Sequence, residues 1–179
     1  MISPLAYVDP KAEIGNNVTI HPFAYIDKNV VIGDNCEVLP YASVLAGTTL
    51  GKNNRIFQGA ILGAEPQDFR FKGDATRLTI GDNNIIREYV VINRATSAQG
   101  ETRIGNNNYI LKGTRIGHDC LIDDDCILGI DCDLSGDCHI HSKAILAGRV
   151  IIKENCRVGS WSLIKSGCRT SKDIPPYII

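Results

Sequence analysis

The 179-residue sequence lacks the features that mark membrane, secreted or nucleic-acid-coating proteins. It has no long apolar run, which excludes a transmembrane helix. Residues 1–5 show neither the basic nor the apolar region of a secretion signal. Neither sign of charge is in excess, because 19 basic and 20 acidic side chains give a net charge of -1. We therefore expect a cytoplasmic protein that neither inserts into a membrane nor binds nucleic acid.

Aromatic residues (6%) and methionine (one residue) are also scarce, but the composition is otherwise that of a globular protein. Its 44% hydrophobic and 22% charged residues exclude a disordered chain. The length fits one domain with a sizeable core or two very small ones. Seven cysteines are an odd number, and without a secretion signal they do not suit a closed disulfide framework.

A period of six residues organises the sequence. Of the 27 positions taken every sixth residue from 8 to 164, all but Asp68, Asp74 and Ala98 are aliphatic. Neither an α-helix nor a coiled coil has this period. The aliphatic series is Val8, Ile14, Ile20, Ile26, Ile32, Val38, Val44, Leu50, Ile56, Leu62, Ile80, Ile86, Ile92, Ile104, Ile110, Ile116, Ile122, Leu128, Leu134, Ile140, Leu146, Ile152, Val158 and Ile164.

Each hexad is typical of a short strand followed by a tight turn. A small or β-branched residue stands two positions before the aliphatic one, so both side chains point to the same face of a strand. Glycine, asparagine or aspartate follows within three positions, where a turn requires a positive φ. We predict an all-β fold, a single-stranded parallel β-helix of hexapeptide repeats. Three hexads make each coil, and about eight coils stack into a column roughly 40 Å tall.

The cysteines follow the same register. All seven occupy the small inward position where other hexads have alanine or valine, so we predict that they fill the core and form neither a metal site nor disulfides. They are Cys36, Cys120, Cys126, Cys132, Cys138, Cys156 and Cys168.

Two polar segments, at about 64–79 and 94–103, interrupt the repeats and resume in register. We expect them to protrude from a single domain, residues 1–179, as two loops. The first is richer than a plain linker, because it combines Pro66, Gln67, Asp68, Phe69 and Arg70. We interpret the second as a tolerated surface insertion.

His118 is the clearest candidate for chemistry. The register places it in a turn, projecting outward at a corner of the coil, where an imidazole suits general-base catalysis. Asp119 would orient that imidazole. From the residues alone, an exposed turn histidine without a function is the favoured interpretation.

Two other features suggest weaker hypotheses. His139 and His141 flank the inward Ile140 and point the same way, as a zinc site like that of trimeric β-helix carbonic anhydrases would need. No HxxxxH or CxxC spacing supports a metal site, so we expect none. Residues 142–173 carry seven basic side chains against two acidic ones. This segment is either a binding surface for a nucleotide diphosphate, coenzyme A or an acidic carrier, or simply a solvated surface.

Several motifs together resemble the UDP-N-acetylglucosamine acyltransferase family. They are Pro66-Gln67-Asp68, Gly73 to Arg77 ahead of Ile80-Gly81-Asp82-Asn83, Ile86-Arg87-Glu88, Gly117-His118-Asp119-Cys120 and Asp173-Ile174-Pro175-Pro176-Tyr177. The resemblance implies a left-handed β-helix that forms a homotrimer with active sites between columns. It also implies direct transfer of a (3-hydroxy)acyl chain from acyl carrier protein to the sugar 3-hydroxyl of UDP-N-acetylglucosamine, in lipid A synthesis. The acyl thioester is a co-substrate, and no cofactor is expected.

The resemblance also implies roles for individual residues. His118 is similar to the general base and Asp119 to its orienting partner. Gly136 matches the residue whose N–H stabilises the thioester oxyanion. The substrate-binding positions are Gln67, Asp68, Arg70, Lys153 and Glu154, with the first loop reaching over a neighbouring chain.

The sequence departs from the family pattern within the site. Arg115 and Asp137 stand where the family often has histidines, and Lys153-Glu154 replace a His-Gln pair. We expect the family's C-terminal helical region to be absent from residues 1–179. Two alternatives therefore stay open: an acetyl-CoA-dependent N-acetyltransferase acting on a nucleotide amino sugar, and a catalytically degenerate β-helix.

Overall fold

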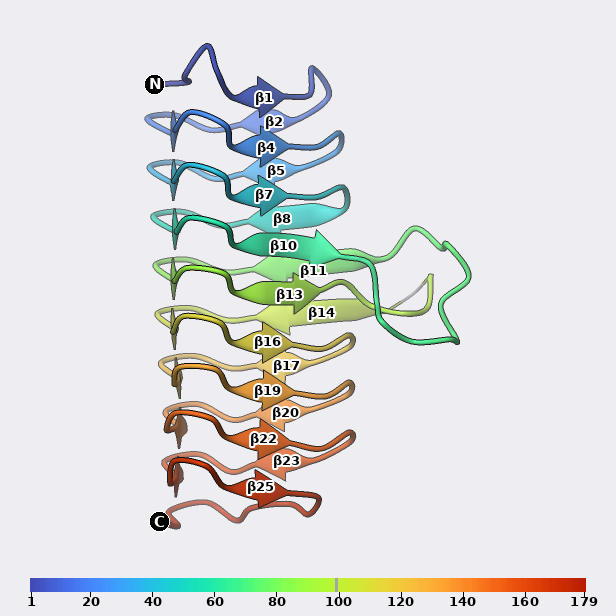
Figure 1. Ribbon diagram of the computed structural model, residues 1–179, viewed down its shortest axis with the longest axis vertical. Helices are drawn as coiled ribbons and strands as arrows, with labels where there is room; N and C mark the ends of the chain where they lie inside the picture. Colours follow the sequence, from blue (N-terminus) through green and yellow to red (C-terminus); the bar gives the residue numbers. More distant parts are fainter. Residues whose placement is uncertain (99) are drawn as a thin grey trace.

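The computed structural model describes residues 1–98 and 100–179, and across these ranges the regular structure consists entirely of short strands. Most strands have two residues, as the hexad pattern predicts. They stack into a straight column with the chain termini at its two ends (Figure 1). In Figure 1 the near strands run to the right and the strands behind them run to the left while the chain descends, so the winding is left-handed. The predicted β-helix is confirmed.

The 25 strands form three parallel sheets. The first sheet contains β1 (Tyr7–Val8), β4 (Tyr25–Ile26), β7 (Ser43–Val44), β10 (Ile61–Ala64), β13 (Val91–Asn93), β16 (Arg115–Ile116), β19 (Asp133–Leu134), β22 (Ile151–Ile152) and β25 (Arg169–Thr170). The second sheet contains β2 (Glu13–Ile14), β5 (Val31–Ile32), β8 (Thr48–Leu50), β11 (Arg77–Ile80), β14 (Glu101–Ile104), β17 (Leu121–Ile122), β20 (His139–Ile140) and β23 (Arg157–Val158). The third sheet contains β3 (Thr19–Ile20), β6 (Glu37–Val38), β9 (Arg55–Ile56), β12 (Ile85–Ile86), β15 (Tyr109–Ile110), β18 (Ile127–Leu128), β21 (Ile145–Leu146) and β24 (Leu163–Ile164).

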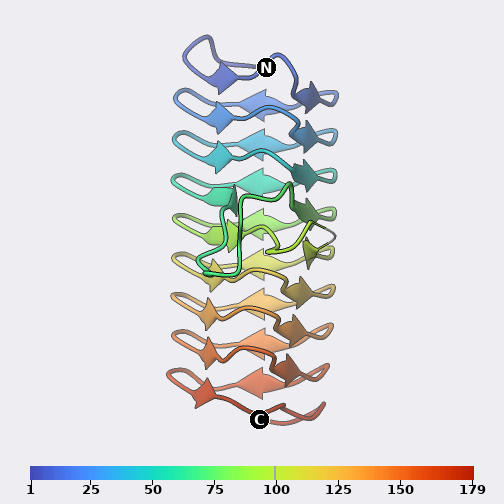
Figure 2. The same ribbon diagram turned by 90° about the vertical axis from the view of Figure 1, so that its right-hand side faces the viewer.

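Each strand pairs with the strand three further along the chain, as the three-sided column seen in Figure 2 requires. Val8 lies opposite Ile26, and Leu134 lies opposite Ile152. Hexad positions 18 residues apart therefore stack in adjacent coils. A side chain at one corner has its neighbours on the same corner of the coils above and below.

The core is a stack of aliphatic residues that are almost fully buried, from Ile20 to Ile164. Each such side chain stabilises the fold by about 1.5–3 kcal/mol relative to an exposed position. Six of the seven cysteines are buried among them, as predicted. For Cys168 the prediction is wrong, because it lies in the last described coil and its side chain is exposed.

One wall of the core contains a feature that the sequence analysis missed. Asn54, Asn84 and Asn108 are buried at the small inward position of three successive coils. The Asn84 N–H and side-chain amide both donate to Asn54 Oδ1, at 2.8 and 3.1 Å. The Asn108 N–H donates to Asn84 Oδ1 at 2.8 Å, which continues the ladder. These amides fill the space of a small aliphatic residue while bonding the coils to one another.

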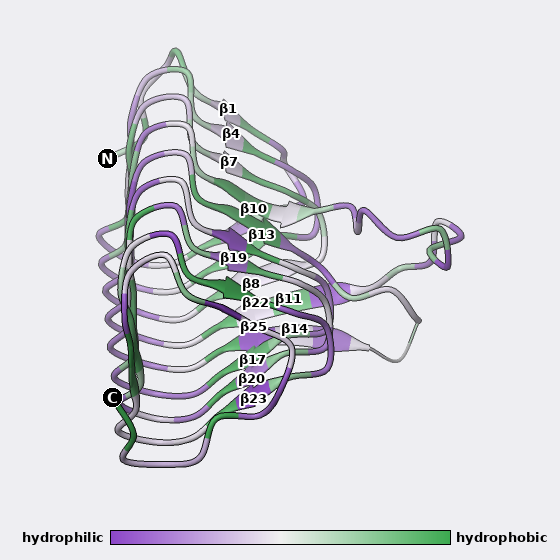
Figure 3. Ribbon diagram, turned by 60° about the horizontal axis from the view of Figure 1, so that its bottom comes forward, coloured by the Kyte–Doolittle hydropathy of each residue, from purple (hydrophilic) through white to green (hydrophobic). Residues whose placement is uncertain are grey.

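Two loops leave the column on one side (Figure 1). The first lies between Ala64, where β10 ends, and Arg77, where β11 begins. The second lies between Asn93 and Glu101, and residue 99 of it is outside the described residues. Both are shorter than the predicted segments because the flanking strands extend past the usual two residues. The first loop is mostly hydrophilic (Figure 3). Across the described ranges there is no helix with the length and apolarity to cross a membrane.

Candidate active site

His118 lies in the turn between β16 and β17, as its register predicts. It is not an exposed turn histidine, however, because only 7% of its surface is accessible. The first loop covers it from outside, and Gly136 lies against its ring from the next coil. A Cβ placed on Gly136 would overlap the imidazole, so only glycine leaves room for the ring here. Burial of this kind favours a site over an idle surface residue.

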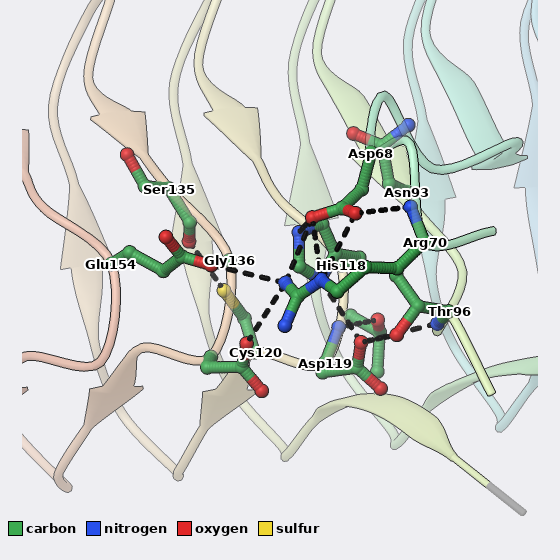
Figure 4. A network of polar contacts seen from close by, with 12 residues as sticks. Asp68, Arg70, Asn93, Thr96, His118, Asp119, Cys120, Ser135, Gly136 and Glu154 are labelled. Atoms are coloured by element: carbon green, nitrogen blue, oxygen red, sulfur yellow. Dashed lines mark hydrogen bonds and ion pairs between the residues drawn. The ribbon is translucent and has the colours of Figure 1, made fainter.

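Two carboxylates bracket the imidazole (Figure 4). His118 Nδ1 lies 2.9 Å from Asp119 Oδ2, and Nε2 lies 3.3 Å from Asp68 Oδ2. Asp119 follows His118 directly and has a φ of 57°, a conformation that aspartate tolerates in turns. Its side chain therefore turns back toward the ring. The predicted pairing of His118 with Asp119 is present in the structure.

The second loop holds Asp119 in place. The Thr96 Oγ1–H and N–H both donate to Asp119 Oδ2, at 2.7 and 3.1 Å. From the other side, the Asp119 N–H donates to Thr102 Oγ1 at 2.8 Å. The second loop is therefore more than the tolerated insertion that the sequence suggested. Thr96 is a candidate site residue that the sequence analysis missed, because nothing in the hexad pattern places this loop over the turn.

The first loop is tied to the same corner by Arg70. The Arg70 guanidinium makes a two-pronged contact with Asp68, with Nε 3.0 Å from Oδ1 and Nη2 2.8 Å from Oδ2. These bonds, together with the Arg70 backbone N–H, lower the pKa of Asp68 to about 2. Arg70 Nη2 also lies 3.1 Å from Glu154 Oε1 and 3.8 Å from Asp137 Oδ2. The loop is thus fastened to two coils of its own chain.

The pKa of Asp137 is shifted in the opposite direction to the pKa of Asp68. Its backbone N–H donates to the His118 carbonyl at 2.9 Å, so it belongs to the coil below the histidine. Burial, and then the negative charge of Asp119, raise the pKa of Asp137 above its ordinary value.

A hollow of about 200 Å³ opens beside His118. The predicted residues His118, Gly136, Gln67, Asp68 and Glu154 line it. Its other lining residues are Asn93, Arg115, Gly117 and Ser135, of which the sequence analysis had singled out Arg115 and Gly117. Lys153 does not line the hollow. Its backbone N–H donates to the Thr170 carbonyl at 2.9 Å, and its side chain is half-buried at the corner below.

Asp68, His118 and Glu154 bring three potential metal-ligating atoms within 4.8 Å of one another. Arg70 already supplies a cation between two of them, since its Nη2 contacts both carboxylates. The two carboxylates of this cluster therefore already have a cationic partner in the Arg70 side chain. What remains available is the imidazole, fixed at Nδ1 by a carboxylate and facing a hollow at Nε2. Such a ring can accept a proton from a hydroxyl group placed in that hollow.

Two curated relatives of the chain are acyltransferases of the same name. No protein-family model matches the chain. The chain is 45% identical over 179 residues to the acyl-[acyl-carrier-protein]--UDP-N-acetylglucosamine O-acyltransferase of Janthinobacterium sp. (strain Marseille), covering 99% of this chain and 68% of that protein. It is 48% identical over 178 residues to the protein of the same name from Xanthomonas oryzae pv. oryzae (strain PXO99A), with the same coverage.

Solved structures agree. A UDP-N-acetylglucosamine acyltransferase from Bacteroides fragilis 9343 superposes with a TM-score of 0.98 at 51% identity, covering 99% of this chain and 70% of that one. The Francisella novicida UDP-N-acetylglucosamine acyltransferase superposes with a TM-score of 0.97 at 43% identity, covering 99% and 65%. The chain thus spans about two thirds of the length of these proteins. Over that length it has the same fold as they do.

Proposed function

The chain belongs to the UDP-N-acetylglucosamine acyltransferase family, and from that premise we propose what its site does. It transfers a (3-hydroxy)acyl chain from acyl carrier protein to the 3-hydroxyl of UDP-N-acetylglucosamine, a reaction of lipid A synthesis. One observation carries the proposal. His118 is buried with Nδ1 on Asp119 and presents Nε2 to a hollow beside Gly136.

His118 acts as general base. With the ring neutral, Nδ1–H donates to Asp119 Oδ2, and the Nε2 lone pair accepts the proton of the sugar hydroxyl. The hydroxyl oxygen attacks the thioester carbonyl, the new C–O bond forms and the C–S bond breaks. The imidazolium returns its proton to the departing thiolate. No oxidation state changes, so the reaction balances without a cofactor. Proton transfer of this kind contributes about 10²–10⁴-fold to the rate.

Gly136 stabilises the negative charge that develops on the thioester oxygen. Its backbone lies against the His118 ring, and none of the described hydrogen bonds uses the Gly136 N–H. A free N–H beside the base is placed to donate to an oxyanion formed there. Loss of one such donor costs about 10²–10³-fold in comparable reactions.

Asp68 and Arg70 prepare the entry of the sugar. Asp68 Oδ2 stands where the hydroxyl must lie to reach His118 Nε2. The substrate hydroxyl therefore replaces the Asp68 carboxylate beside His118 Nε2. Asp68 then accepts from the sugar, while Gln67, Arg70, Lys153 and Glu154 bind the rest of the nucleotide sugar.

We include a homotrimer and a cytoplasmic location in the proposal. The hollow of about 200 Å³ is smaller than the roughly 300–1,000 Å³ of sites that enclose an organic ligand. A neighbouring column would supply the missing wall for a nucleotide sugar and an acyl chain. Seven cysteines, most of them used as core residues, suit a reducing compartment.

The test offers the purified chain UDP-N-acetylglucosamine with 3-hydroxyacyl carrier protein or with acetyl-CoA, and identifies the product by mass spectrometry. We expect O-acylation from the carrier protein, lowered at least about 10²-fold by His118→Ala. His21→Ala is the matched control, since His21 also contacts a carboxylate, Glu37, at 3.0 Å, but at another corner. Transfer from acetyl-CoA alone, or an equal rate in His118→Ala, would contradict the proposal.

A further inference from the structure

A second cluster of chemistry-bearing side chains lies at the far end of β17 from His118. Asp123 follows this strand directly, as His141 follows β20 in the next coil. We call the position that directly follows each second-sheet strand the glycine corner. In all the remaining coils this position is glycine. The glycines are Gly15, Gly33, Gly51, Gly81, Gly105 and Gly159. Asp123 and His141 are therefore the two exceptions, and they occupy consecutive coils.

In the coils that have glycine, no side chain projects from this corner. A Cβ placed on Gly33 would lie 2.6 Å from the carbonyl carbon of Gly51, and one on Gly81 would lie 2.7 Å from the Gly105 carbonyl oxygen. Side chains appear only where Asp123 and His141 face each other across one coil step. His139, two residues before His141 on β20, projects from the same face.

The three side chains converge on a common point. His139 Nε2 lies 2.9 Å from Asp123 Oδ1, and His141 Nδ1 lies 3.3 Å from Asp123 Oδ2. The two imidazole rings are 3.8 Å apart between centroids. The three ligand atoms all lie within 4.8 Å of one another. Two ligands bound tetrahedrally to one zinc ion at about 2.1 Å are about 3.4 Å apart, so small side-chain rotations would admit an ion.

The surroundings favour a cation with open coordination positions. Residues 119–141 contain seven aspartates and neither lysine nor arginine. A hollow of about 350 Å³ borders Asp123, formed partly because Gly81 and Gly105 carry no side chains. Arg103 lines the same hollow and has no ion pair among residues 1–98 and 100–179. An ion held by Asp123 would face this hollow, with Arg103 available to an anionic ligand.

We propose that Asp123, His139 and His141 form a binding site for a divalent transition-metal ion, with Zn²⁺ as its simplest occupant. Two imidazoles and one carboxylate are a donor set that such ions prefer. Solvent or a small anion completes the coordination from the hollow. The site is separate from the His118 corner and takes no part in the acyl transfer, and it reverses our expectation from spacing alone that the chain binds no metal.

The test measures Zn²⁺ binding to the full chain after treatment with a chelator and dialysis. We expect one Zn²⁺ per chain by isothermal titration calorimetry, and a tetrahedral Co²⁺ absorption spectrum when Co²⁺ is used instead. Asp123→Gly and His141→Gly restore the residue that the other coils carry, and His139→Leu repeats its register neighbour Leu121. Each should weaken Zn²⁺ binding at least about tenfold.

Two control variants separate this site from the other histidines. His21→Gln removes a histidine that also contacts a carboxylate, and His118→Ala removes the one histidine in the Asp68 cluster. Both should keep one Zn²⁺ per chain. If His118→Ala loses the ion while His139→Leu keeps it, or if no variant changes the affinity, the proposal is wrong.

A spectroscopic measurement on the unsubstituted protein tests the same assignment if a variant folds poorly. The chain has four histidines, so selective ¹³C labelling gives four resolvable imidazole environments in the unsubstituted protein. Addition of Co²⁺ should shift the signals of two of them, those lost in His139→Leu and His141→Gly. Shifts confined to the His21 or His118 signals, or no shifts at all, would overturn the assignment.

Discussion

His118 Nε2 faces Asp68 Oδ2 at 3.3 Å, on the side of the ring opposite to its contact with Asp119. A neutral imidazole donates one hydrogen bond, so it cannot satisfy both carboxylates at once. In the mechanism proposed above, Asp68 Oδ2 lies where the substrate hydroxyl would bind, so the hydroxyl would have to replace it. The first loop would then both cover the base and be displaced by the substrate.

The charge of Asp68 gives a pH dependence with a defined sign. Its pKa is about 2 in the folded chain against 3.8 for the free side chain, because Arg70 binds it. The stabilisation is present above pH 3.8 and is lost as the pH falls toward 2. The Tm of the wild type should be higher than that of Asp68→Asn at pH 5, and the difference in Tm should shrink between pH 4 and 2. Asp74→Asn serves as the matched control, because it removes a carboxylate of the same loop that makes no ion pair with Arg70.

Gly136→Ala should abolish most of the activity while leaving the column folded. The added Cβ overlaps the His118 ring and displaces both the base and the oxyanion donor, so we expect at least about a 10²-fold fall in kcat/KM. Gly148→Ala is the matched control, because its nearest contact would be the Ile130 carbonyl at 3.5 Å. Steady-state kinetics and circular dichroism check both. Comparable activity in the two variants would contradict the role of Gly136.

Thr96→Val should slow the reaction without weakening substrate binding. It removes the hydroxyl that donates to Asp119 Oδ2 but keeps the side-chain volume. A hydrogen bond to a charged group is worth about 1.5–3 kcal/mol, so we expect kcat to fall about tenfold with KM little changed. Thr96→Ser should restore the rate and Ser97→Ala should leave it unaltered. A fall in Ser97→Ala as large as in Thr96→Val would point to general disturbance of the loop.

Thiol labelling should distinguish Cys168 from the other six cysteines. Cys168 is exposed, whereas burial raises the pKa of Cys126 to about 11 and keeps it from the reagent. Peptide mapping after iodoacetamide treatment of the native chain should find the label on Cys168 alone. All seven should react after unfolding. Equal labelling of Cys126 in the native chain would show that the core opens readily.

The period of six residues was enough to predict a parallel β-helix, because each coil repeats the same two inward positions, whereas its left-handedness was implied by the family resemblance. It also explains part of the site. His118, Gly136 and Glu154 are spaced 18 residues apart, so the register alone stacks them at one corner. The same spacing relates Asp123 to His141, a signal that the search for conventional metal-binding motifs overlooked.

The loop residues were harder to predict. Asp68 and Thr96 reach His118 and Asp119 through segments that leave the repeat, and a periodic pattern carries no information about their path. Similarly, Asn84 occupies a position where the pattern predicts a small apolar residue. Its burial depends on a bond partner one coil away, Asn54, which becomes recognisable only when the stacking of coils is known.

Pairing restricted to adjacent coils also makes the molecule a linear chain of cooperative units. Opening should therefore spread inward from the outermost coils, and amide protons should exchange with solvent in a gradient along the column. The turn that carries His118 lies several coils from either end (Figure 1). The slowest-exchanging amides are expected in the middle coils, around β13, one coil from β16. The candidate site therefore lies next to the part of the column whose fluctuations are smallest.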